Sequence, residues 1–112
     1  MNQKNEPSVI LPVETARETL RARALSHAQT LARSVSRLTS ADAQPCLEYG
    51  EEIAAQRSDM DALLFAQHCR CCLERCIAGG RSSLRYRFLD GSTACVRFQR
   101  LSLGRVRIRG LA

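Results

Sequence analysis

Five residues that can ligate metals or act as nucleophiles lie in one short stretch of the chain: His68, Cys69, Cys71, Cys72 and Cys76. Cys69 and Cys72 form a C-x-x-C pair, a spacing typical of zinc sites and of redox-active dithiols. Cys46 or His68 would be a further ligand of a metal ion. The pair therefore favours, as one alternative, a sensor whose cysteines bind a metal or respond to oxidation.

The same spacing also fits the buried side of a helix. Phe65, Cys69, Cys72 and Cys76 follow one another in steps of four, three and four residues, which places them on one stripe. A reduced cysteine packs like a small apolar residue, and no second C-x-x-C completes a zinc ribbon. We favour core packing, so we expect neither a metal nor another cofactor. The candidates for a redox pair or an intermolecular disulfide are Cys46, Cys71 and Cys95.

Patterns that support catalysis are missing from the sequence. It has no Gly-rich phosphate loop, no G-x-S-x-G and no H-E-x-x-H. We do not expect His68 to activate Cys69, because neighbouring positions on a helix point about 100° apart. Glu48, Glu51 and Glu52 would share a helix, where acids at this density usually form a solvated face. The protein is therefore expected not to be an enzyme.

Length and apolar runs restrict the class of protein. A chain of 112 residues fits one domain and leaves little room for a deep substrate cavity. The N-terminal apolar run, Val9 to Leu11, is shorter than the core of a signal peptide, and no stretch approaches the roughly 18 apolar residues of a membrane span. We therefore expect a cytoplasmic protein that does not bind a membrane and whose thiols are reduced.

Charge is unevenly divided along the chain. The formal net charge is +6, yet residues 1–80 hold nine basic and ten acidic side chains. Residues 81–112 hold eight arginines and one acid, Asp90, and so carry a net charge of +7. Residues 41–61 form an acidic segment, with six acids and one base. The molecule therefore has an acidic segment and a basic C-terminal third.

The N-terminal part of the chain predicts an arm and a long helix. Residues 1–13 are expected to form an extended arm, in part because Pro7 biases the residue before it toward extended geometry. The apolar residues of the arm would dock on the body of the protein or on a partner. A long amphipathic helix is predicted over residues 15–38, with Thr15 and Glu18 at capping-box spacing.

Helical patterns continue through the middle of the chain. Two further helices are predicted over residues 43–57 and 59–78, although Arg57–Ser58 could equally be a bend within one helix. Gly79–Gly80 ends the helical part, as a left-handed C-terminal cap.

After these glycines the apolar period changes from 3.6 to 2. Strands are predicted over residues 83–89, 93–99 and 104–109, with turns at Asp90–Gly91 and Ser102–Gly104. The expected fold is therefore a single α+β domain over residues 14–112. In it, two or three N-terminal helices, the first one long, would pack on a C-terminal three-stranded antiparallel meander.

On this sheet, alternate side chains would face the helices and the others would form an outer face. The alternation places six arginines on the outer face: Arg85, Arg87, Arg97, Arg105, Arg107 and Arg109. Guanidinium groups without interleaved acids repel one another, and a phosphate backbone or an acidic protein surface would relieve the repulsion. The aromatic residues that would stack on bases fall on the other face. The alternatives are a solvated face, an acidic protein such as a second copy, and a nucleic acid.

The long helix offers a second surface for binding. It would be about 35 Å long, so part of it could need a partner to cover its apolar stripe. The alternative is a core helix packed by its own domain. If the helix binds a partner, its apolar contacts would come from Leu20, Leu31, Val35 and Leu38, and its polar rim from Arg17, Arg21, Arg33 and Arg37.

In size and layout the chain resembles the small bacterial anti-activators that bind quorum-sensing transcription regulators of the LuxR type. The features that it shares with them are the long helix over residues 16–38, the compact helix and hairpin remainder, and the lack of catalytic motifs. The resemblance implies a non-enzymatic regulator that inhibits or adapts another protein, such as a transcription factor, through the long helix, with a homodimer as a further expectation. A nucleic-acid binder using the outer arginines is the first alternative, and the cysteine sensor the second.

Overall fold

The computed structural model describes the backbone of residues 7–38 and 47–111 and the side chains of residues 7–36 and 53–111. The fold is α+β, as predicted. The predicted helix start near residue 43 and the candidate Cys46 lie outside the described residues. The elements follow in the order β1 (Ser8–Pro12), α1 (Val13–Leu38), α2 (Leu47–Gly79), β2 (Arg81–Arg87), β3 (Thr93–Arg100) and β4 (Arg105–Arg109).

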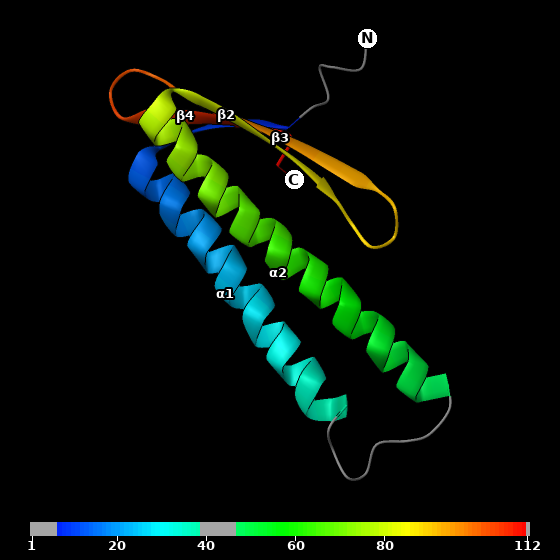
Figure 1. The fold of residues 1–112 in the computed structure, drawn as a ribbon. Coiled ribbons are helices and arrows are strands. Elements are labelled where there is room, and N and C mark those ends of the chain that lie inside the picture. Colours follow the sequence, from blue (N-terminus) through cyan, green and yellow to red (C-terminus); the bar gives the residue numbers. More distant parts are fainter. Residues whose placement is uncertain (1–6, 39–46, 112) are drawn as a thin grey trace.

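The two helices form an antiparallel hairpin, and the sheet covers one end of it (Figure 1). α1 has 26 residues and α2 has 33, so α2 is about 50 Å long. The molecule is accordingly elongated, with a longest extent of 55 Å. The sheet lies against the start of α1 and the C-terminal half of α2, while the other end of the hairpin projects past it.

Of the two alternatives for Arg57–Ser58, the structure has the single helix, because α2 runs through this position without interruption. Packing against α1 explains the continuity. Ser34 on α1 is 1% exposed, and its hydroxyl donates a hydrogen bond of 2.7 Å to the carboxylate of Asp59. Asp59 therefore serves a tertiary contact. So does Asp61, which binds the β2–β3 hairpin.

The sheet has four strands rather than the predicted three, in the order β1-β4-β3-β2, and all neighbours are antiparallel. The additional strand is part of the predicted arm. β1 pairs with β4 in a register that sets Leu11 opposite Val106 and Val9 opposite Ile108. Leu11 packs against the core, so burial of an apolar side chain adds to the ladder hydrogen bonds that hold this strand.

The core lies between the sheet and the sheet-covered end of the helices. β3 and β4 contribute Val96, Phe98, Val106 and Ile108, as the predicted alternation requires. The helices contribute Leu20 and, from α2, the cysteine stripe. The buried members of that stripe are Cys69, Cys72 and Cys76.

The predicted turns are confirmed. Asp90–Gly91 lies in the turn between β2 and β3, where Gly91 has a φ of +92°. Leu103 and Gly104 have positive φ in the turn between β3 and β4. α2 ends at Gly79, and Gly80, with a φ of +95°, donates its N–H to the Cys76 carbonyl over 2.7 Å. A left-handed glycine at this point is the usual end of a helix.

Candidate functional site on the outer face of the sheet

The sheet gathers seven arginines on the face that points away from the helices. Strand alternation exposes every second residue of β2 and, as far as Arg97, of β3, and the register aligns those positions across the sheet. We call this surface the arginine face, and it consists of Arg81, Arg85, Arg87, Arg97, Arg105, Arg107 and Arg109. Six of these side chains are exposed and Arg107 is half-buried.

All six arginines that the sequence predicted for this face lie on it. Arg81 was missed, because the strand was expected to begin at residue 83, whereas β2 begins directly after Gly80. Counting back from Arg85 in steps of two would have included it. Ser83 and Gln99 lie between the arginines on the same face. The sequence prediction did not include them because they carry no charge.

Arg97 on β3 lies directly opposite Arg109 on β4. Like charges at directly opposite positions destabilise an antiparallel pair. None of the four strands contains an acidic residue. The guanidinium groups therefore share this face without an acid on the same strands, an arrangement that suits an anionic ligand.

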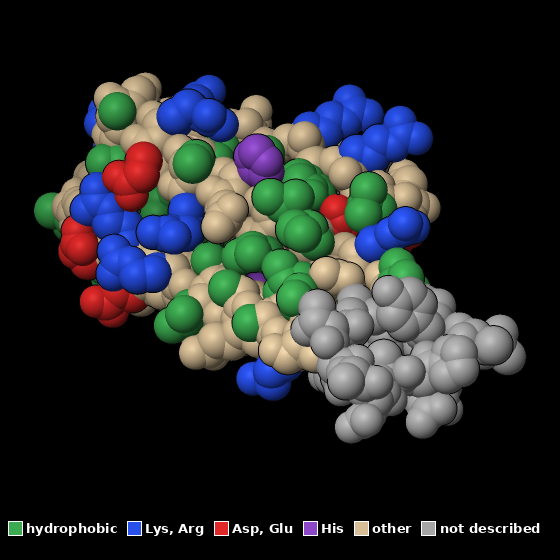
Figure 2. Space-filling model, turned by 60° about the horizontal axis from the view of Figure 1, so that its bottom comes forward, with side chains coloured by type: hydrophobic (Ala, Val, Ile, Leu, Met, Phe, Trp, Pro, Cys, Tyr) green, Lys and Arg blue, Asp and Glu red, His purple; other side chains and the backbone are tan. Residues whose placement is uncertain are grey.

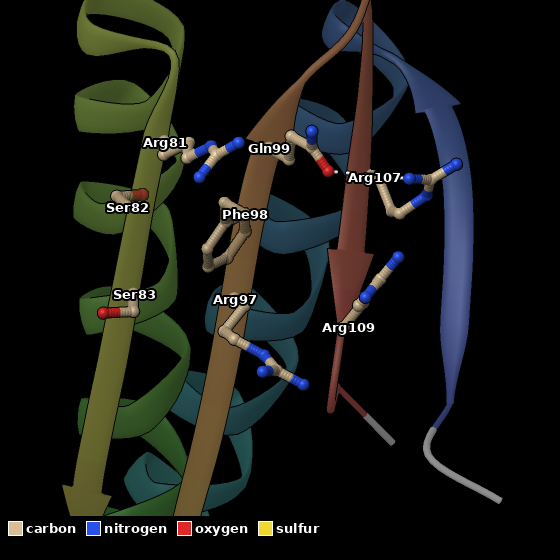
Figure 3. Close-up of a pocket in the computed structure, with 8 residues that line it drawn as sticks. All are labelled: Arg81, Ser82, Ser83, Arg97, Phe98, Gln99, Arg107 and Arg109. Atoms are coloured by element: carbon tan, nitrogen blue, oxygen red, sulfur yellow. Dashed lines mark hydrogen bonds between the residues drawn. The ribbon is translucent and has the colours of Figure 1, made fainter. Parts of the chain in front are cut away.

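A hollow of about 380 Å³ lies in this face over β2, β3 and β4. Figure 3 shows the Arg81 guanidinium between β2 and β3 and the Arg97 guanidinium between β3 and β4. Arg107 donates from Nη1 to Oε1 of Gln99 over 3.5 Å. Backbone and side-chain atoms of neighbouring residues complete the lining, which consists of Arg81, Ser82, Ser83, Arg97, Phe98, Gln99, Arg107 and Arg109.

Aromatic rings are placed on the opposite side of the sheet. Tyr86 and Phe88 pack on Phe65 of α2, with ring centroids 5.6 and 5.4 Å away. Phe98 is 2% exposed and belongs to the core. The arginine face therefore offers charge and hydrogen-bond donors, without a ring on which a base could stack.

The cysteine stripe is built into the core. Cys69, Cys72 and Cys76 are fully buried, and burial raises the pKa of Cys69 to about 12, with Cys72 nearby adding to the shift. The Cys72 thiol donates to the Ser82 hydroxyl over 3.1 Å. Cys71 and Cys95 are exposed. Within residues 7–36 and 53–111, no three His, Cys, Asp or Glu side chains are arranged to hold a metal ion.

Only some residues of the predicted helix surface are available for binding. Leu20 is 1% exposed and forms part of the core, so it offers no contact to a partner. Leu31 is half-buried, whereas Val35 and Arg21 are exposed. The side chains of Leu38 and Arg37 lie outside the described residues.

The remaining two arginines of the predicted rim make contacts within the helical hairpin. Arg17 donates from Nε and Nη2 to the Glu74 carboxylate, over 2.9 Å in each case, and pairs also with Glu14. These bonds lower the pKa of Glu74. Arg33 donates from Nη2 to the Thr30 hydroxyl over 3.3 Å.

The half of the hairpin that the sheet does not cover carries exposed apolar side chains. Leu25, near the middle of α1, is 58% exposed, and Val35 and Met60 are exposed to a smaller degree. In the view of Figure 2, hydrophobic side chains gather over the middle of the molecule, between groups of arginines. None of the described helical segments is long and apolar enough to cross a membrane.

Protein-family models, curated proteins and solved structures were each compared with the chain, and none of them matched.

Proposed function

We propose that the protein binds nucleic acid through the arginine face and that it contacts the phosphate backbone rather than the bases. The observation that carries the proposal is the gathering of seven arginines on one face of a sheet whose strands contain no acid, with a hollow among them. Guanidinium forks bind phosphate oxygens in bidentate fashion. Backbone contacts of this kind position a nucleic acid and carry no direct sequence information.

An acidic protein is the other partner that the charge would suit, but the chemistry of the face favours nucleic acid. The centre of a protein–protein interface is usually apolar and rich in aromatic residues. The outward-facing positions of β2 and β3 instead hold, beside the arginines, the polar or small residues Ser83, Thr93, Cys95 and Gln99. A uniform polyanion needs no apolar centre, whereas a folded protein partner normally supplies one.

The test is a titration of labelled single-stranded and duplex oligonucleotides, followed by fluorescence anisotropy at several salt concentrations. For four phosphates contacted, counterion release lowers affinity about 50- to 150-fold between 50 and 200 mM salt. The double variant R97Q/R109Q should bind more weakly and with a shallower salt dependence. The matched control R70Q/R75Q removes the same charge from exposed positions on α2 and should bind like the wild type. Absence of binding at low salt would overturn the proposal.

A second candidate follows from the apolar side chains on the uncovered half of the hairpin. We propose that this half docks a protein partner, and the resemblance noted above makes a transcription regulator the partner to try first. Leu25 and Val35 on α1 would supply apolar contact, with Arg21 and Arg33 as its rim. Native mass spectrometry of the protein drawn from its own cells would reveal such a complex. The variant R21E/R33E should lose it while its thermal melting stays unchanged; an intact complex would contradict the assignment.

A further inference from the structure

The register arranges the donors of the hollow in two rows that cross the sheet. In one row Arg81, Gln99 and Arg107 lie side by side on β2, β3 and β4. In the next row the side chains of Ser83, Arg97 and Arg109 occupy the same three strands. All six residues line the hollow of about 380 Å³. Each row therefore combines two guanidinium groups with one neutral hydrogen-bonding side chain.

One such row is suited to one phosphate. A guanidinium presents parallel N–H groups that match two phosphate oxygens, and an amide or hydroxyl supplies a further donor. The two rows are two residues apart along each strand, which corresponds to about 6.8 Å. Two phosphates joined by a sugar span a separation of this order. The two phosphorus atoms of a pyrophosphate share one bridging oxygen and lie too close together to occupy both rows.

We propose that the hollow binds two successive phosphodiesters of one nucleic-acid strand, one in each row, with the backbone running along β3. This inference rests on the proposed nucleic-acid binding. The nucleic-acid backbone would run along the strands because the two rows lie one after the other in that direction. This direction is supported by Arg85 and Arg87, which continue the line of arginines on β2 beyond the hollow.

The adjacency of the two phosphates can be tested with probes of equal charge. Both are labelled oligothymidylates whose linkages are neutral methylphosphonates except for two phosphodiesters. In the first probe the two phosphodiesters are adjacent, and in the second they are separated by three neutral linkages. The first should bind the full-length protein about tenfold more tightly, because it alone fills both rows. Equal affinities, or stronger binding of inorganic pyrophosphate than of the first probe, would overturn the two-row site.

The geometry of the rows can be tested with substitutions that keep the charge. R97K and R109K each preserve a positive charge but lose the planar fork, so each should weaken the adjacent-phosphate probe about tenfold and leave the separated probe little changed. R75K, on α2, is the control and should bind both probes like the wild type. Wild-type affinity in R97K and R109K would show a diffuse charge effect and overturn the site. If the fully charged oligothymidylate itself fails to bind, the proposed function fails instead.

Discussion

The Tyr86 hydroxyl on β2 donates a hydrogen bond to the Asp61 carboxylate on α2, with 3.0 Å between the two oxygens. The backbone N–H of Leu89 donates to the other carboxylate oxygen over 2.7 Å. Asp61 is 9% exposed, so little water competes for these bonds. One carboxylate thereby fastens both the end of β2 and the turn after it to the helix, and it keeps the basic hairpin in place over the core.

Asp61→Ala should therefore lower the free energy of unfolding by about 2–3 kcal/mol, because two hydrogen bonds to a buried charge are lost. Tyr86→Phe removes one of them and should cost about 1 kcal/mol. Urea denaturation followed by circular dichroism would measure both. The two changes should be coupled: in the Asp61→Ala background, Tyr86→Phe should cost much less. If its cost is the same in both backgrounds, the hydrogen bond does not contribute.

Alkaline pH should destabilise the fold through Cys69. Burial raises the pKa of this thiol to about 12, so the folded state keeps its proton at pH values where the unfolded chain has lost it. Stability is therefore constant below the ordinary thiol pKa and falls as pH rises from about 9 toward 12, by at most about 1.4 kcal/mol per pH unit from this group. Burial and Asp61 also raise the pKa of Tyr86, which adds loss in the same direction at higher pH.

Urea melts at pH 7 and pH 10 would check this dependence. Cys69→Ala should lower stability at pH 7, because it leaves a small cavity in the core, but it should show a smaller further loss at pH 10 than the wild type. An equal loss in both proteins would assign the alkaline effect to other groups.

Thiol reactivity should divide the described cysteines into two classes. Cys71 and Cys95 are exposed, whereas Cys69, Cys72 and Cys76 are buried. Under native conditions iodoacetamide should label the first two rapidly and the other three only as fast as the protein opens, because the thiolate must form and be reached. Peptide mass spectrometry with time would measure the rates. Rapid labelling of Cys72, before unfolding is detected, would contradict the core assignment.

The sheet could be predicted well from the sequence because its two faces differ so strongly. Val96 and Phe98 alternate with arginine and other polar residues, and a slip of one residue would bury charge. That alternation alone was enough to place the arginines on one face. It did not show which residues lie opposite each other, because the register depends on the pairing of strands. The Arg97–Arg109 opposition and the two rows of the hollow therefore emerge only from the structure.

The continuity of α2 and the additional strand β1 could not be predicted from local sequence. Both depend on contacts between segments that are far apart in the chain. Ser58 and Asp61 have the spacing of a helix start, but Asp59 binds Ser34 and Asp61 binds the hairpin. Similarly, Pro7 indicates an extended arm, and pairing with the edge of β4 makes part of that arm the strand β1. Local sequence preferences do not determine which distant residue a carboxylate will bind or which strand will pair with a sheet edge.

Arg109→Glu should stabilise the free protein while it abolishes nucleic-acid binding. The new carboxylate would lie opposite Arg97, so a cross-strand pair of like charges becomes one of opposite charges, which is worth about 0.2–1 kcal/mol. The gain should shrink as salt is added, since the pair is exposed. Arg85→Glu is the matched control, because Arg85 lies opposite Cys95 and gains no such partner. Thermal melts at low and high salt would measure the difference. A loss of stability in Arg109→Glu, or a gain no larger than in Arg85→Glu, would mean that the charges of this cross-strand pair do not contribute to stability.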